Sequence, residues 1–242
     1  MRLVSLSPSL TEILEALESR ENLIGITSHC APKGPEVIGS PKALEVSRIL
    51  NLKPDWIFAD VRENRPEEIR ELKKKHPVIE FDVRSIQSAK DAIIAVGRTI
   101  GKPEKARELA AAIEEEWAAI RQRVAERNHR VRTLLLLWKQ PYVTVNFDTY
   151  ASRLMEACGA ENVFHAEPLP EFPVELEDMI EQNPELVLLA GDPYVFKKAD
   201  IARFRKYRIF SKVRIECVNG RLFSCFGPTT IEALKKMRDL IL

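Results

Sequence analysis

The sequence predicts an α/β fold of two Rossmann-like lobes, each with a parallel sheet, joined by one long rigid α-helix, with a ligand cleft between the lobes. Apolar strand-like runs alternate with helical patterns along the chain, which is typical of parallel sheets covered by helices. The same succession of segments also occurs twice, around Glu15 and Pro54 in the first half and around Glu156 and Pro184 in the second. A chain of 242 residues has room for two such lobes.

The first lobe is expected over residues 1–102. Its first strand leads directly into a helix, because Ser9, Thr11 and Glu12 supply the hydroxyl cap and the early acid of a helix start. The four predicted strands of this lobe are Leu3–Leu6, Leu23–Ile26, Trp56–Ala59 and Val78–Phe81.

A single helix over residues 103–128 is predicted to link the lobes. Pro103 suits a first helical turn, and apolar residues then recur at steps of three and four up to Val124. Because a helix is stiffer than a Gly/Ser linker, we expect little hinge motion.

The second lobe is expected over residues 129–242. Cys217 and Cys225 flank Asn219 and Gly220, so the pattern predicts a hairpin in which two reduced thiols are favoured over a disulfide. The predicted strands are Thr133–Leu137, Val163–Phe164, Leu186–Ala190 and Arg214–Val218.

Composition argues against several classes of protein. Lys plus Arg number 37 and Asp plus Glu 36, so the formal charge of +1 gives no reason to expect nucleic acid or an anionic membrane as a partner. The basic stretch between Lys197 and Arg214 is interpreted as a solvated face. The cysteines have no zinc-ligand spacing, and no apolar run is long enough for a membrane span.

The start of the chain bears on its compartment. A strand follows Met1 at once and leaves no room for a signal peptide, so a cytoplasmic protein is expected if Met1 is native. The alternative is the mature form of a periplasmic or cell-surface protein. In both cases we expect a monomer.

Candidate site residues follow from the rule that ligands bind beyond the carboxyl ends of strands in α/β sheets. The set mixes aromatic and hydrogen-bonding groups and suits a large, partly apolar ligand. It lacks a nucleophile, base and orienting acid, so no catalytic residue and no enzyme is predicted. The residues are Ser7, Pro8, Ser9, Ser28, His29, Cys30, Asp60, Val61, Arg62 and Asn64 in the first lobe, and Trp138, Tyr142, Glu171, Phe172, Asp192, Tyr194, Phe223 and Phe226 in the second.

His29 stands out within this set. A neutral imidazole can serve as an axial ligand of a metal, whereas the simpler alternative is a local hydrogen bond within the loop.

Five segments together resemble a known family. RLVSLSPSLTEIL, IGITSHC, ALEVSRILNLKPDWIFA, SRLMEACGAENVF and FGPTTIEAL are similar to segments of the cobalamin- and iron-siderophore-binding proteins of ABC importers, most closely to the cobalamin-binding branch. The resemblance implies a non-catalytic protein that needs no cofactor and holds a metal chelate between its lobes. Cobalamin or another corrinoid is the first candidate ligand, and haem or a ferric siderophore are the alternatives.

The resemblance also implies that one acid on each lobe docks on an ABC permease. The repeat indicates which acids, because Glu68 with Leu72 matches Asp200 with Phe204. We therefore expect Glu67 or Glu68, together with Asp200, to be the docking residues.

Two other interpretations stay open at this point. One is a cytosolic protein or enzyme that handles corrinoids or metal cofactors on the same two-lobed fold, with His29 or Cys30 at a metal centre. The other is a degenerate relative that retains the fold for protein interaction.

Overall fold

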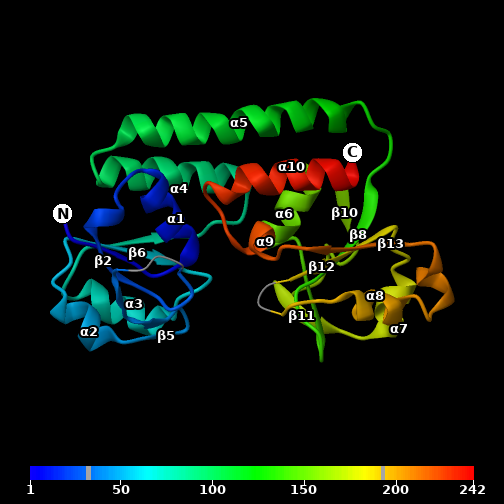
Figure 1. Cartoon of the computed structure of the whole chain (residues 1–242), viewed down its shortest axis with the longest axis horizontal. Helices are drawn as coiled ribbons and strands as arrows, with labels where there is room; N and C mark the ends of the chain where they lie inside the picture. The colour runs from blue at the N-terminus through cyan, green and yellow to red at the C-terminus, as the bar shows by residue number, and fades with distance from the viewer. Residues whose placement is uncertain (31–33, 192–193) are drawn as a thin grey trace. The chain divides into compact units, whose positions relative to one another are not determined.

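Two parallel sheets dominate the structure, a computed structural model that describes residues 1–30, 34–191 and 194–242 (Figure 1). One sheet belongs to an N-terminal unit of residues 1–83, 87–112 and 226–228. The other belongs to a C-terminal unit of residues 84–86, 113–225 and 229–242. The predicted α/β fold with a parallel sheet in each half is confirmed.

The sheet of the N-terminal unit has the strand order β3-β2-β1-β6-β7. Each of the four predicted strands is present to within one residue, and β3 is an additional short edge strand. A small antiparallel pair, β4 (Gly39–Ser40) and β5 (Ala43–Leu44), follows β3. The strands of the main sheet are β1 (Leu3–Ser5), β2 (Leu23–Ile26), β3 (Glu36–Val37), β6 (Trp56–Asp60) and β7 (Val78–Phe81).

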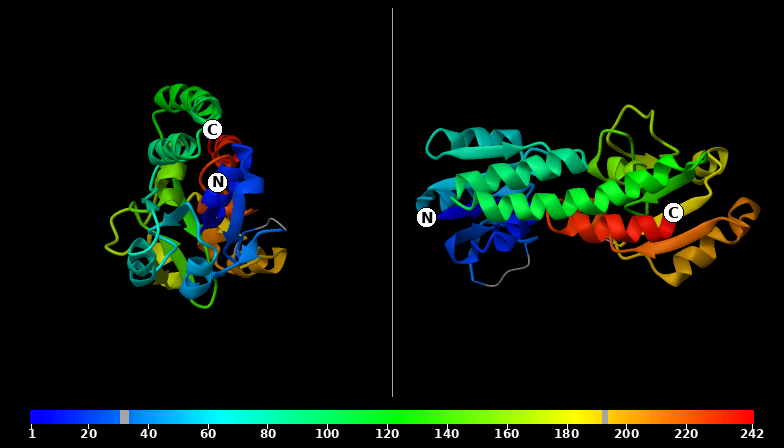
Figure 2. Two further views of the ribbon diagram at one scale, coloured as in Figure 1. Left: turned by 90° about the vertical axis from the view of Figure 1, so that its left-hand side faces the viewer. Right: turned by 90° about the horizontal axis from the view of Figure 1, so that it is seen from above.

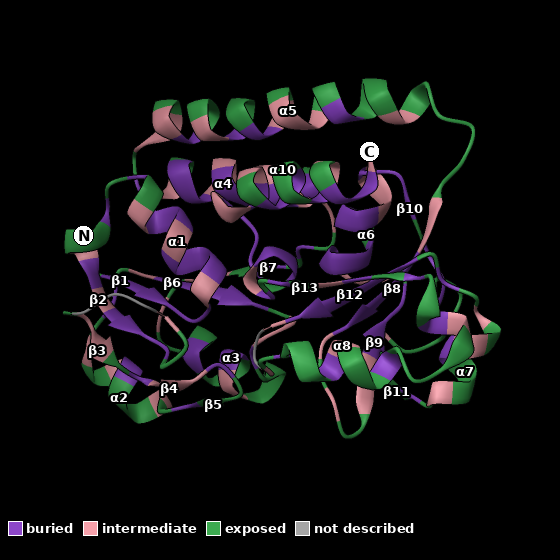
Figure 3. Cartoon of the chain, turned by 45° about the vertical axis from the view of Figure 1, so that its right-hand side comes forward, coloured by how far each residue is buried: buried purple, intermediate pink, exposed green. Residues whose placement is uncertain are grey.

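Helices cover both faces of this sheet, with α1 and α4 on one face and α2 and α3 on the other (Figure 1). Under α2 and α3, the strand residues Val4 and Ile57 pack with Ile69 and Leu72 in one apolar cluster. The strands are buried while the helices expose their outer sides (Figure 3). The helices are α1 (Pro8–Ala16), η1 (Arg20–Asn22), α2 (Val46–Asn51), α3 (Pro66–Lys73) and α4 (Ile86–Thr99).

The sheet of the C-terminal unit has the order β10-β8-β12-β13, and an antiparallel pair of β9 and β11 accompanies it. The strands are β8 (Val131–Leu136), β9 (Tyr142–Val145), β10 (Ala160–Asn162), β11 (Glu171–Val174), β12 (Leu186–Ala190) and β13 (Arg214–Val218). The helical segments are α6 (Tyr150–Ala157), α7 (Leu176–Glu181), α8 (Lys198–Phe204), η2 (Arg208–Ser211), α9 (Arg221–Ser224) and α10 (Thr229–Ile241).

Two predictions for the second half are wrong, and an asparagine explains each. The Asn162 side chain accepts a hydrogen bond from the Phe164 N–H (3.0 Å), which turns the chain, so the strand ends before Val163. The Asn219 side chain likewise accepts the Arg221 N–H (3.1 Å) and starts α9 where a hairpin was expected.

The two cysteines beside this turn are therefore not hairpin partners. Cys217 is exposed on β13, whereas Cys225 is buried just after α9, and both are free thiols.

The internal repeat predicted from the sequence is visible in the topology. The order β2-β1-β6-β7 corresponds to β10-β8-β12-β13 when the strands are taken in chain order. Hydroxyl side chains cap the equivalent helices, Ser7 on α1 and Thr149 on α6. Equivalent positive φ angles occur before the matching prolines, 46° at Lys53 and 45° at Asn183.

Each unit also has a clasp at the amino ends of its two central strands. In the N-terminal unit the Arg2 N–H donates to the Asp55 carboxylate (2.7 Å), and the Asp55 N–H donates to the Arg2 carbonyl (2.8 Å). The Arg2 guanidinium completes the clasp by donating to the carbonyl of Leu52 (2.7 Å).

The C-terminal unit repeats this arrangement between β8 and β12. The Arg132 N–H donates to the Glu185 carboxylate (2.9 Å), and the Glu185 N–H donates to the Arg132 carbonyl (2.8 Å). The Arg132 guanidinium donates to the carbonyl of Gln182 (2.6 Å).

One continuous helix, α5 (Pro103–Ala125), connects the sequences of the two halves and ends three residues earlier than predicted. It lies beside α4 in both views of Figure 2. At the contact Gly97 faces Ala106, and a Cβ atom at Gly97 would lie 2.2 Å from the Ala106 Cβ, so this approach requires glycine. The division between the units falls inside α5, after Ala112, and the predicted boundaries 1–102, 103–128 and 129–242 stay a prediction.

We expect Glu185→Ala to lower the free energy of unfolding by about 1 kcal/mol, because the Arg132 N–H and the His129 ring lose their acceptor. Glu181→Ala on the exposed side of α7 is the control and should change it by less than about 0.5 kcal/mol. Urea denaturation followed by circular dichroism measures both. Equal effects would show that the clasp contributes nothing of its own.

Candidate functional site

The turn after β1 is held by its own hydroxyl groups. Ser7 caps α1 by accepting the Leu10 N–H (3.4 Å), with half-buried Pro8 as the first helical residue. The buried Ser9 hydroxyl accepts the N–H of Phe226 (3.2 Å). The hydroxyls of Ser7 and Ser9 are thus used inside the N-terminal unit, where they set the shape of the turn.

The contact with Phe226 depends on the next residue, Gly227. Its φ of 101° lies in the left-handed region, and a Cβ atom there would lie 2.7 Å from the Cγ1 atom of Ile13. Residues 226–228 therefore belong to the N-terminal unit although they lie late in the sequence.

The loop after β2 offers the most accessible polar groups of this unit. Ser28 and His29 are exposed, and no hydrogen bond to the His29 ring occurs within the described residues. Cys30 is half-buried, with its sulfur 3.1 Å from the Thr11 hydroxyl and 3.3 Å from the Thr27 hydroxyl. An exposed imidazole on a loop braced in this way is available to an external ligand.

Asn64 is a buried centre of hydrogen bonds behind the loop that follows β6. Its side-chain oxygen accepts the Asp60 N–H (2.8 Å), and its amide group donates to the carbonyls of Leu6 (2.9 Å) and Pro41 (3.2 Å). One side chain thus joins the loops after β1, β4 and β6. Asn64 acts from within, by fixing the positions of these three loops.

Asp60 lies at the carboxyl end of β6 and is almost fully buried, with 4% of its surface exposed. Its carboxylate accepts the Arg62 N–H (3.0 Å). The pKa of Asp60 is raised from 3.8 to about 7, chiefly by burial and to a lesser extent by the charge of Glu63, while the hydrogen bonds from the backbone of Arg62 and Glu63 and the charge of Lys42 limit the rise. Near neutral pH this carboxyl group is therefore only partly ionised.

The surface beside Asp60 is formed by its neighbours. Val61 is exposed, with 39% of its surface accessible. Arg62 donates to the carboxylate of Asp82 (3.1 Å), a residue that follows the end of β7. Asp82 and Arg84 are absent from the predicted set, although the rule on carboxyl ends of strands applies equally to β7.

The carboxyl end of β8 in the C-terminal unit carries an aromatic cluster. Trp138 contacts Tyr194 edge-on, with ring centroids 5.6 Å apart, and Tyr194 contacts Phe196 at 4.8 Å. Trp138 is 39% exposed and Tyr194 is half-buried. Lys139 lies with its ammonium group 6.0 Å from the Tyr194 ring. The cluster presents a partly apolar surface with one adjacent cation.

Lys139 also forms an ion pair with Asp200, and both side chains are largely buried. The second carboxylate oxygen of Asp200 accepts the Lys197 N–H (2.8 Å) at the start of α8. The hydrogen bonds and the charge of Lys139 lower the pKa of Asp200 although burial alone would raise it. Asp200 therefore links α8 to the loop after β8.

The other predicted residues of this unit differ in how accessible they are. Tyr142 and Phe172 are half-buried and pack against the apolar core, where the ring centroids of Tyr142 and Phe204 lie 5.5 Å apart. Glu171 is exposed at the start of β11. Phe223 is buried on α9, and Asp192 lies outside the described residues.

An exposed aromatic residue shortly after β9, Phe147, is also absent from the predicted set. It is 38% exposed, and it lies between the guanidinium group of Arg153 (5.4 Å from the ring centroid) and the ring of His165 (5.4 Å). Its position just beyond a strand end was the available signal.

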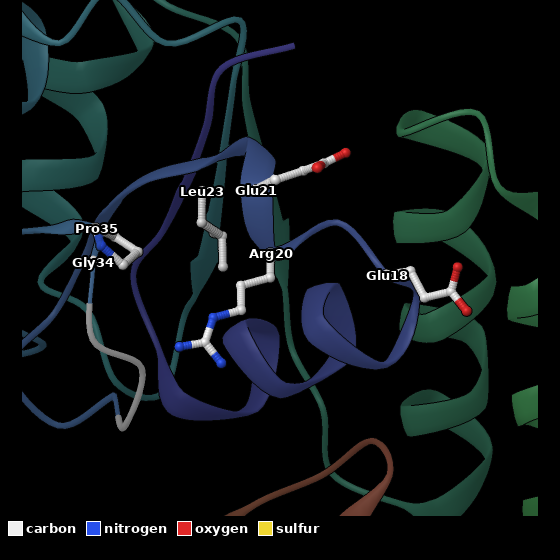
Figure 4. Close-up of a pocket in the computed structure, with 6 residues that line it drawn as sticks. All are labelled: Glu18, Arg20, Glu21, Leu23, Gly34 and Pro35. Atoms are coloured by element: carbon white, nitrogen blue, oxygen red, sulfur yellow. The ribbon is translucent and has the colours of Figure 1, made fainter.

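Two cavities lie away from these loops. One of about 520 Å³ is at the amino end of β2, the opposite end from the candidate loops, and in Figure 4 the side chains of Glu18 and Glu21 point away from Arg20 there. The other, of about 660 Å³, lies beyond the carboxyl ends of α5 and α6.

The larger cavity is lined by cations that already have a structural role. Arg130 donates to the carbonyls of Glu156 (3.0 Å) and Ala160 (3.2 Å), and Arg127 donates to that of Ile241 (2.7 Å). These contacts satisfy carbonyls near helix ends. We therefore place the candidate site at the strand ends rather than in either cavity.

The described residues contain no group of three or more His, Cys, Asp or Glu side chains that could hold a metal ion. Among the same residues, the hydrogen bonds of the histidine rings go to Pro54, Glu185 and Glu156, so no imidazole is placed to activate a hydroxyl or thiol.

Two units, each with a parallel sheet covered by helices, have the architecture of two-lobed α/β binding proteins. The sequence profile of the family described as "Periplasmic binding protein" matches residues 3–214, and the chain belongs to this family. The family resemblance predicted from the sequence is confirmed. No helix in the described ranges combines the length and apolar character needed to cross a membrane.

Relatives match along almost the whole chain. The vitamin B12-binding protein of Pectobacterium carotovorum subsp. carotovorum (strain PC1) is 27% identical over 243 residues, covering 98% of this chain and 86% of its own. The periplasmic vitamin B12 binding protein BtuF of Vibrio cholerae superimposes with a TM-score of 0.85 at 21% identity, and the match covers 98% of this chain and 95% of that of BtuF.

A further solved structure, the periplasmic heme-binding protein RhuT from Roseiflexus sp. RS-1, has a TM-score of 0.83 at 22% identity, covering 98% of each chain. At these identities the structures establish the fold alone. The relatives are named as binding proteins, and the cytosolic alternative finds no support among them.

The raised pKa of Asp60 makes stability depend on pH. The folded state holds the proton of Asp60 more tightly than the unfolded chain does. The contribution of this proton to the free energy of unfolding is therefore complete below pH 3.8 and is lost as the pH rises to about 7. The loss amounts to at most about 4 kcal/mol. Asp60→Asn stays neutral and retains the acceptor for Arg62, so we expect its stability to fall less over this range.

Urea denaturation at several pH values between about 4 and 8 measures this difference. Asp91→Asn, an exposed position on α4, is the control and should follow the wild-type curve. Parallel curves for Asp60→Asn and the wild type would contradict the assignment.

Proposed function

We propose that this protein is a non-catalytic substrate-binding component of an ABC importer and that its ligand is cobalamin or another corrinoid. Haem and ferric siderophores are the alternative ligands. The observation that carries the proposal is the end-to-end similarity to a vitamin B12-binding protein. The exposed Trp138–Tyr194 pair supports it, because aromatic edges and faces suit a large planar macrocycle. A periplasmic or cell-surface location follows from the same proposal.

The ligand would be contacted by the loops at the strand ends of both units. The N-terminal unit would supply hydrogen-bonding groups on firmly held loops, and the C-terminal unit would supply aromatic surface. Because Asn64 holds the loops after β1, β4 and β6 by hydrogen bonds, little free energy is needed to order these loops of the N-terminal unit on binding. We expect dissociation constants of order nM to μM, which correspond to binding free energies of about −12 to −8 kcal/mol.

Titration with cobalamin, cobinamide, haem and ferric siderophores tests the ligand. We expect a corrinoid to quench tryptophan fluorescence, and Trp138→Phe to remove most of the quenching while binding measured by absorbance persists. Trp117→Phe on α5 is the matched control and should retain the quenching. The proposal fails if no ligand of this panel binds with a dissociation constant below roughly 100 μM, which corresponds to a binding free energy of about −5.5 kcal/mol.

His29 would act as an axial ligand of the metal in the bound chelate. Aquocobalamin should then change its visible absorbance on binding as imidazole replaces water, and His29→Ala should abolish the change while affinity falls about 10- to 100-fold. His165→Ala, another exposed histidine, is the control. A spectral change that survives in His29→Ala would exclude this role.

Docking on a permease is proposed to involve the acids on α3 and α8. Glu67 is exposed in the first turn of α3 and Glu68 is half-buried, whereas Asp200 is buried against Lys139. Glu67 is therefore the acid best placed to meet an external cation. Asp200 would need to exchange its internal partner for an external one.

We expect Glu67→Lys to reduce ligand-dependent stimulation of permease ATP hydrolysis at least about tenfold, because an approaching cation would then be repelled. Ligand affinity should stay unchanged. Glu71→Lys, an exposed position on the same helix, is the control. Unchanged stimulation in Glu67→Lys would remove this residue from the docking surface.

A further inference from the structure

The segment of residues 197–214 concentrates positive charge on the C-terminal unit. It contains eight basic residues and a single acid, Asp200, whereas the rest of the chain contains 29 basic and 35 acidic residues. The segment comprises α8, η2 and the first residue of the edge strand β13. The nearly neutral formal charge of the whole chain therefore conceals an uneven distribution.

Asp200 does not neutralise this segment. Its side chain is 8% exposed and is paired with Lys139, a residue from outside the segment, as well as with the Lys197 N–H. The acid thus offsets mainly a buried lysine, and the segment keeps a large excess of positive charge.

The side chain of Arg205 has a structural role. Its guanidinium group donates to the carbonyls of Ser211 (3.1 Å) and Val213 (2.6 Å) and closes the turn around η2. The other seven cations are exposed and form no ion pair within the described residues. They are Lys197, Lys198, Arg203, Lys206, Arg208, Lys212 and Arg214; we call them the basic surface.

On α3, which is equivalent to α8 in the repeat, cations are compensated. Arg70 pairs with Glu67 (3.4 Å), and Lys73 pairs with Glu80. The basic surface instead retains the repulsion among its like charges. An anion from outside the chain would relieve that repulsion.

Apolar groups lie exposed beside these cations. Tyr207 is 41% exposed between Lys206 and Arg208, and Val195 is 63% exposed just before the segment. The outer side of α8 is exposed in Figure 3. Tyrosine rings among cations favour the headgroup level of a bilayer, where the ring meets acyl chains and the cations meet phosphates.

We propose that the basic surface binds the anionic headgroups of a lipid bilayer and holds the C-terminal unit against the membrane. This adsorption differs from ligand binding and needs no bound chelate. It would confine the protein to the surface on which its proposed permease resides. Clusters of four to eight cations are of the size that attracts anionic bilayers, and each cation increases the affinity for the bilayer by about tenfold or less.

Sedimentation with vesicles tests the proposal, using the full chain without ligand. We expect binding to vesicles that contain phosphatidylglycerol and none to pure phosphatidylcholine vesicles. The binding should weaken as NaCl rises from about 0.05 M to about 0.5 M, because salt screens the attraction. Lys206→Glu/Arg208→Glu should weaken it at least about tenfold. Tyr207→Ser should weaken it severalfold without changing its dependence on salt.

Lys74→Glu/Lys75→Glu makes the same change in net charge at the exposed end of α3 and is the matched control. Circular dichroism confirms that each variant is folded. Absence of wild-type binding, equal binding to both kinds of vesicle, or an equal loss in the control would each overturn the proposal. Tighter binding of soluble polyglutamate than of phosphatidylglycerol vesicles would indicate an acidic protein partner and would also overturn it.

Ligand titration distinguishes this proposal from the proposed function. Lys206→Glu/Arg208→Glu should bind the ligand with unchanged affinity, because both residues lie outside the candidate ligand-binding loops. A protein that binds vesicles and no chelate would support the basic surface alone. A protein that binds a chelate and no vesicles would overturn the basic surface alone.

Discussion

The clasp between an arginine and a carboxylate at the amino ends of the central strands is the constraint on which each unit depends. It pairs the start of the first strand with the turn that precedes the third, through Arg2 and Asp55 in one unit and Arg132 and Glu185 in the other. Because the strands are parallel, fixing their register at one end also fixes which residues emerge at the other. The loops that carry Asp60 and Trp138 thus take their positions partly from contacts at the far edge of the sheet.

The sequence predicted this architecture where the signal is local. Continuous apolar runs identified β2 and β12 with their bounds, because a strand buried on both faces has an unmistakable composition. The local patterns predicted the wrong element where the hydrogen bond of one polar side chain determines the direction of the chain. Asn162 ends β10 and Asn219 begins α9, and an isolated asparagine looks the same in a hairpin, a turn or a helix start.

The candidate site was predictable as a set of loops but not as a set of roles. A strand end indicated Asn64 and the internal repeat indicated Asp200, yet their partners Leu6, Pro41 and Lys139 are distant in sequence. Phe226 was expected on the second lobe, although its N–H bonds to Ser9 and it belongs to the N-terminal unit. Such contacts depend on tertiary packing, which no spacing rule encodes.

The two sets of loops differ in the kind of interaction that they offer, and this difference bears on selectivity. In the N-terminal unit Ser7, Ser9 and Asn64 are buried and hydrogen-bonded within the unit, so they contribute little to distinguishing one polar ligand from another. In the C-terminal unit Trp138 is exposed and Tyr194 is half-exposed, and aromatic contacts of this kind are tolerant of chemical detail. Selection among metal chelates would then rest on shape and on the metal's preference for imidazole. The partly ionised carboxyl of Asp60 lies beside these loops, so its charge state would alter the electrostatic potential that an anionic chelate meets near neutral pH.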